Sequence, residues 1–203
     1  MFSRRNTLTT ALVALIVTAA LHAAALAQTP GPPAAPPASN PQYGPLIAHG
    51  RMMFQGMKNW LVASAEKMSE EQYAYKPTAG VRSYGQIVGH LADQNYRFCS
   101  LALGVPNPNT SKIEQTKTKR ADLIAALKES LAYCDKAYAG LTDANALQPV
   151  KLGPIDHPRI NLFTINLAHS SLHYGNLITY MRMNNITPPS SDFGGTEPPR
   201  PNR

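Results

Sequence analysis

The chain has 203 residues, of which 43% are hydrophobic and 15% charged, and its formal net charge is +7. The basic residues are scattered and no array of aromatic residues lies among them, which argues against nucleic-acid binding. The length allows one compact domain with a single hydrophobic core, preceded and followed by segments of other kinds.

The first 27 residues have the pattern of a signal peptide. Arg4 and Arg5 precede a long apolar run, which ends in small residues up to Ala27. This order predicts an exported protein, periplasmic or secreted, with no stable membrane insertion after cleavage. An uncleaved membrane anchor is the alternative, because the apolar run is long. The basic start also resembles a twin-arginine signal, so the export route, general or twin-arginine, stays open.

Residues 28–42 are rich in proline and alanine, which cannot continue a helix or build a core, and we expect a linker there. The ordered domain is predicted over residues 43–191, followed by a disordered tail over residues 192–203. Its first element is an amphipathic helix over Pro45–Met68, with apolar residues at helical spacing.

A second helix is predicted from Ser83 to Leu103, because Ser83 and Gln86 form a capping-box pattern. A third runs over residues 112–139, with Thr110 and Ser111 as candidate caps and Gly140 at its end. A fourth covers Asn161–Met183.

No segment alternates with the period of a strand, so the sequence predicts an all-α protein, most economically a four-helix bundle.

Cys99 and Cys134 are the only cysteines. Export would bring them into an oxidising compartment, but whether they pair depends on the topology. In an antiparallel helix pair with a short loop they would lie roughly 20 Å apart along the axis, whereas in a parallel pair joined by a crossover they could meet. The alternative is two buried, unpaired thiols.

Three histidines occur on stripes predicted to face the core. His90 lies on the second helix, and His169 and His173 lie one turn apart on the fourth. Buried imidazoles need hydrogen-bond partners or a metal. We expect these three to form a facial tripod for a divalent ion, zinc or alternatively nickel, that leaves coordination positions open. His49 and His157 lie off these stripes and are expected to be surface residues.

The same region excludes some reactions. In the zinc-protease signature a glutamate follows the first histidine, but here that position is Ser170. No Ser-His-Asp or Cys-His arrangement is suggested, so catalytic residues are not assigned. Asp93, one turn after His90, could orient an imidazole or replace a ligand, or could be a solvated helix charge.

Residues 65–90, the run His169-Ser-Ser-Leu-His-Tyr-Gly-Asn176, Arg182 and residues 187–191 together resemble the DinB family. This resemblance implies a four-helix bundle with a long crossover, and a metal held by one histidine of the second helix and two of the fourth. His90, His169 and His173 occupy those places. The family also implies a homodimer in many members.

Some relatives are thiol S-transferases or thiol-linked isomerases, in which a metal lowers the pKa of a bound thiol. This chain differs from those enzymes, which are cytoplasmic, because it carries a predicted export signal. Three hypotheses remain: a metal-dependent transferase or hydrolase acting on a small molecule, a metal-binding protein without catalysis, and a structural bundle whose histidines are only hydrogen-bonded.

Overall fold

The structure is a computed structural model that describes residues 46–192. The predicted signal peptide, the linker, the first residues of the predicted domain and the tail from residue 193 lie outside the described residues. Within residues 46–192, no helix has both the length and the apolar character needed to cross a membrane.

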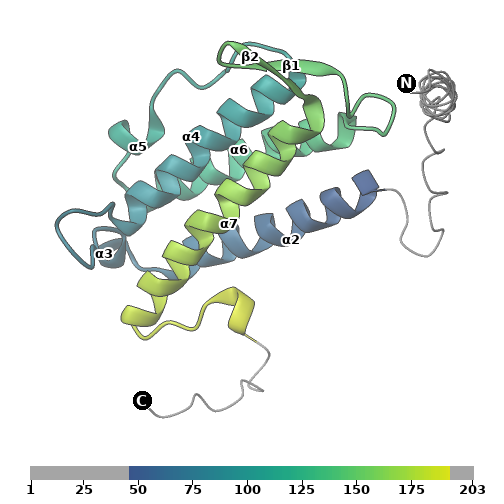
Figure 1. Cartoon of the computed structure of the whole chain (residues 1–203). Helices are drawn as coiled ribbons and strands as arrows, with labels where there is room; N and C mark the ends of the chain where they lie inside the picture. The colour runs from purple at the N-terminus through teal and green to yellow at the C-terminus, as the bar shows by residue number, and fades with distance from the viewer. Residues whose placement is uncertain (1–45, 193–203) are drawn as a thin grey trace, which may run out of the picture. The chain divides into compact units, whose positions relative to one another are not determined.

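Four long helices make up most of the described chain (Figure 1): α2 (Leu46–Lys67), α4 (Tyr84–Leu103), α6 (Arg120–Gly140) and α7 (Arg159–Met183). Between them lie the short helices α3 (Glu70–Tyr73) and α5 (Ile113–Thr116) and the strands β1 (Pro149–Leu152) and β2 (Ile155–Pro158); the 3₁₀ helix η1 (Pro189–Ser191) follows. All four long helices contribute to one core, whose fully buried side chains include Leu61, Leu91, Leu127, Leu162 and Leu177.

The predicted start of α4 is confirmed. The Ser83 hydroxyl accepts a hydrogen bond from the backbone N–H of Gln86, and the backbone N–H of Ser83 donates to the Gln86 side chain. Ser69 and Gln72 repeat this capping box at α3, which the sequence analysis did not predict although the same Ser-x-x-Gln pattern is present.

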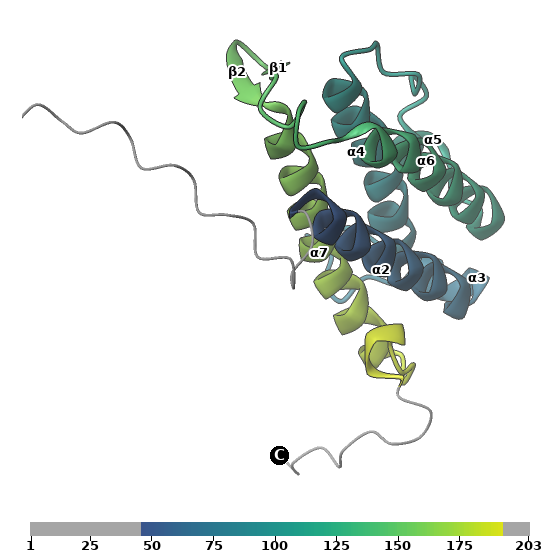
Figure 2. The ribbon, with the colours of Figure 1, turned by 90° about the vertical axis from the view of Figure 1, so that its right-hand side faces the viewer.

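Helices α4 and α6 run parallel, so residues 104–119 form a crossover. Gly85, at the start of α4, approaches Leu123 at the start of α6. Further along both helices, Cys99 and Cys134 form a disulfide with a Cα–Cα distance of 5.4 Å. The alternative of two unpaired thiols is therefore wrong. Figure 2 shows α4 and α6 side by side.

Helix α2 runs antiparallel to α6. At the start of α2, the Arg51 side chain donates hydrogen bonds to the backbone carbonyls of Tyr138 and Ala139 at the end of α6. Helix α7 is antiparallel to α4, because Asn95 bonds Asn166 whereas the earlier His90 lies beside the later His169.

The single third helix predicted over residues 112–139 is wrong. The chain forms α5, then becomes extended at Lys117 (φ −106°, ψ 132°) and Lys119 (φ −75°, ψ 134°), and only then begins α6. Thr110 and Ser111 do not cap a helix, because the N-cap of α5 is Lys112, whose side chain makes no capping bond. The crossover has to return the chain to the start of α4, and one straight helix could not do this.

The expected all-α class holds for most of the described chain, but the sequence analysis did not predict one small hairpin within it. β1 and β2 pair as an antiparallel hairpin in which Leu152 lies opposite Ile155. Gly153, the first residue of the two-residue loop, has φ 64°, a conformation that glycine adopts without steric cost and that suits a tight hairpin. The hairpin has only four residues per strand and leads directly into α7 (Figure 1).

Candidate metal centre

The structure brings together the three histidines singled out from the sequence. His90 lies in the second turn of α4, and His169 and His173 lie on adjacent turns of α7. Each offers one ring nitrogen, and the three nitrogens lie within 4.8 Å of one another. The Nε2 atoms of His90 and His169 are 3.1 Å apart. The antiparallel contact of α4 with α7 and the i, i+4 spacing of the pair produce this cluster.

The cluster is largely shielded from water. His173 is only 8% exposed, while His90 and His169 are partly buried. Burial lowers the pKa of His169 to about 4, and the neighbouring His173 and His90 act in the same direction. Burial likewise lowers the pKa of His173 to about 4. Both imidazoles are therefore neutral at neutral pH, the form that can bind a metal.

A carboxylate that the sequence analysis missed lies on the outer side of His90. Glu114 Oε2 is 2.9 Å from His90 Nδ1, and Glu114 Oε1 accepts a hydrogen bond of 2.7 Å from Arg82 Nε. Burial by itself raises the pKa of Glu114, but the hydrogen bonds and charges of Arg82 and His90 outweigh it and lower the pKa. Glu114 is 24 residues from His90 in the sequence, and no local pattern indicates that they meet.

Asp93 plays none of the three roles considered for it. Its carboxylate accepts hydrogen bonds from the backbone N–H groups of Ile113 and Glu114, at 2.9 and 3.0 Å, and from the side chain of Asn109 at 2.6 Å. It is therefore neither a partner of His90 nor a solvated charge. It anchors the crossover segment to α4.

The other histidines of the described chain lie outside the cluster, as predicted. His49 is exposed, and His157 is hydrogen-bonded to Asn161 near the hairpin. Helical spacing places Leu172 on the same predicted stripe as His169 and His173, but its side chain is 64% exposed. The buried side of α7 is centred one position after His169, on Ser170 and on residues at helical spacing from Ser170.

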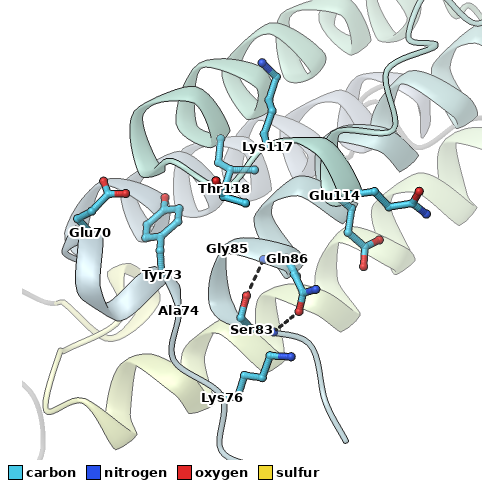
Figure 3. Close-up of a pocket in the computed structure, with 12 residues that line it drawn as sticks. Glu70, Tyr73, Ala74, Lys76, Ser83, Gly85, Gln86, Glu114, Lys117 and Thr118 are labelled. Atoms are coloured by element: carbon cyan, nitrogen blue, oxygen red, sulfur yellow. Dashed lines mark hydrogen bonds between the residues drawn. The ribbon is translucent and has the colours of Figure 1, made fainter. Parts of the chain in front are cut away.

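A cavity of about 600 Å³ reaches the cluster at His173. It is lined mainly by polar side chains, namely Lys76, Arg82, Gln86, Glu114, Asn176 and Tyr180. A second cavity of about 660 Å³, seen in Figure 3, adjoins it and shares Lys76, Gln86 and Glu114. A small molecule in the first cavity would contact His173 of the cluster and charged side chains that include Lys76 and Arg82.

Comparison with known proteins agrees with this architecture. The described fold is similar to a DinB-like protein from Bacillus subtilis (23% identity, TM-score 0.57, covering 68% of this chain and 93% of that one). It is also similar to a DinB-like protein from Bacillus cereus (13% identity, TM-score 0.61, covering 70% and 95%). No curated protein is significantly similar to the chain in sequence. The family model described as DinB superfamily matches residues 53–177, more than half of the chain, and the chain therefore belongs to the DinB superfamily.

Proposed function

We propose that His90, His169 and His173 hold one divalent metal ion, zinc or alternatively nickel, and that the protein is a metal-dependent enzyme acting on a small molecule. The observation that carries the proposal is the convergence of three ring nitrogens within 4.8 Å beside a cavity.

The residues present fit such an ion. In a tetrahedral zinc site with bonds of about 2.0–2.1 Å, neighbouring ligand nitrogens lie roughly 3.3 Å apart. The separation of 3.1 Å between the Nε2 atoms of His90 and His169 is close to that value. The neutrality of His169 and His173 supports ligation, since a protonated imidazole cannot bind a metal.

The cavity favours an enzyme over a protein that only stores metal. A site with three protein ligands leaves room for another, and a bound divalent ion would polarise a substrate oxygen or lower the pKa of a bound water or thiol. Lys76 and Arg82, on the cavity wall, would bind an acidic group of the substrate, while Asn176 and Tyr180 offer hydrogen bonds. We therefore infer a small polar substrate, and both transferase and hydrolase chemistry are compatible with it.

Metal analysis tests the proposal. Protein purified without a metal-affinity tag should contain about one equivalent of a divalent ion, and titration of the metal-free protein should recover it. Substituting alanine for His90, His169 or His173 should weaken binding severely, because two imidazoles remain. His49→Ala and His157→Ala are the controls. Wild-type affinity in any one of the three cluster variants would show that the tripod is wrong.

We also propose export, on the strength of the basic start, the apolar run and the small residues before Gln28. N-terminal sequencing of the protein from a periplasmic or culture fraction should begin near Gln28. An intact Met1 in the membrane fraction would instead support the anchor. The homodimer expected from the family stays a prediction, which sedimentation of the mature chain can test.

A further inference from the structure

We propose that Glu114 is a positioning residue that fixes the proton of His90 on Nδ1 and so aims the lone pair of Nε2 into the histidine cluster. This inference rests in part on the proposed metal site, but it concerns Glu114, which lies in the crossover segment and is not one of the three proposed ligands. Three independent contacts hold Glu114 in place.

The first contact joins the side chains of Glu114 and His90. Glu114 Oε2 lies 2.9 Å from His90 Nδ1. An ionised carboxylate can only accept hydrogen bonds, so the proton of the pair belongs to Nδ1 of the imidazole. The other oxygen, Oε1, is held by Arg82 at 2.7 Å, which prevents the carboxylate from rotating away. With Nδ1 protonated, a neutral His90 has its lone pair on Nε2, the atom that lies 3.1 Å from His169.

The second contact fixes the backbone that carries Glu114. Asp93 lies on α4 one turn beyond His90, and its carboxylate accepts hydrogen bonds from the backbone N–H groups of Ile113 and Glu114. Asp93 thereby ties the first turn of α5 to the same helix that carries His90. His90 lies on α4 and the backbone of Glu114 is hydrogen-bonded to α4, so the same helix fixes the distance between the two side chains.

The third contact is steric. A Cβ atom built on Gly89 would lie 2.8 Å from the Cα atom of Glu114 and 3.1 Å from its nitrogen. Only glycine lets the backbone of α5 approach α4 this closely, directly beside His90. A side chain at this position would push against backbone atoms, which cannot rotate out of the way, and would move Glu114 away from the imidazole.

Such outer carboxylates orient metal-binding histidines and raise their basicity, and their loss typically costs 10–100-fold in metal affinity. We expect Glu114→Ala to weaken metal binding by this factor. Glu114→Gln keeps an oxygen that can accept a hydrogen bond from His90 Nδ1–H, so this variant should retain part of the metal affinity that Glu114→Ala loses. Asp93→Asn and Gly89→Ala leave Glu114 in the chain but displace it, and both should weaken metal binding in the same direction.

Matched controls separate positioning from general damage. Asp135 is also a partly buried carboxylate held by two side chains, Lys58 and Gln55, but on α6. Gly56 is a helical glycine with no atom within 4 Å of a built Cβ. Asp135→Asn and Gly56→Ala should therefore leave metal affinity at the wild-type value.

The decisive measurement needs no metal. Long-range ¹H–¹⁵N correlation spectra of the metal-free protein, at a pH above the ordinary titration range of histidine, distinguish the two neutral tautomers of His90. The wild type should show the Nδ1–H form. Glu114→Ala should show a mixture of both tautomers, and Glu114→Gln should restore the Nδ1–H form in part.

If Glu114→Ala keeps both the wild-type tautomer and the wild-type metal affinity, the inference is wrong, even if Gly89→Ala does not fold. The outcome is separable from that of the proposed function. A wild-type protein that binds no metal, yet shows the Nδ1–H tautomer that depends on Glu114, would overturn the metal site and leave the positioning role of Glu114 intact.

Discussion

Reduction of the Cys99–Cys134 disulfide should remove a large part of the stability of the folded domain. The two cysteines are 35 residues apart in sequence and connect α4 to α6 across the crossover. In the chain-entropy model, a cross-link that closes a loop of this length lowers the entropy of the unfolded chain and thereby stabilises the folded state by about 4 kcal/mol at 25 °C. Domains of this size are stable by only about 5–15 kcal/mol in total, so the change is readily measured.

Urea unfolding of the mature chain, followed by circular dichroism, gives this difference directly. The oxidised protein is compared with the same protein reduced by a phosphine, with EDTA present so that bound metal adds nothing. Reduction breaks the S–S bond but keeps both sulfur atoms and all other side chains of the core. A double variant, Cys99→Ala with Cys134→Ala, should be less stable still, because both sulfurs are buried and their packing contacts would be lost.

Metal affinity supplies the control. Cys99 lies more than two helical turns beyond His90 on α4, so reduction should leave metal binding close to that of the oxidised protein. The reasoning fails if oxidised and reduced proteins unfold at the same urea concentration. It also fails if the denatured, unreduced monomer contains two free thiols, since the bond would then be absent.

Three further outcomes follow from the same structure. The metal-free protein should lose stability as the pH falls from about 6.5 toward about 4, because the unfolded chain binds protons at His169 and His173 before the folded chain does; a constant melting temperature over this range would contradict it. Asn166→Ala should cost about 1–3 kcal/mol in urea unfolding, because its buried partners Asn95 and Tyr138 would lose hydrogen bonds; a loss well below 1 kcal/mol would mean that they find other partners. Metal-loaded protein should melt at a lower temperature after treatment with EDTA, because binding to the folded state stabilises it by about 2.7 kcal/mol at a free-metal concentration 100 times the dissociation constant; an unchanged transition would argue against a bound ion.

Local sequence signals were sufficient for the start of α4 and for the spacing of the paired histidines on α7, but not for the start of α6. The capping box of Ser83 and Gln86 involves residues three positions apart, so it can be recognised without knowledge of the rest of the fold. The i, i+4 spacing of His169 and His173 likewise follows from helix geometry alone. The same local reasoning missed α3, whose Ser-x-x-Gln signal was present, and the hairpin, whose strands are too short to show alternation.

The parallel direction of α4 and α6, the pairing of the cysteines and the contact of Glu114 with His90 were decided by tertiary structure. Each joins residues at least 24 positions apart, and the helical pattern of either partner is compatible with several ways of packing. The crossover selects one of them, because α5 can reach α4 only where Gly89 lets the two backbones approach and where Asp93 accepts its N–H groups. Periodicity could place His90 on a buried face, but only this close backbone contact supplies the carboxylate that bonds to its ring.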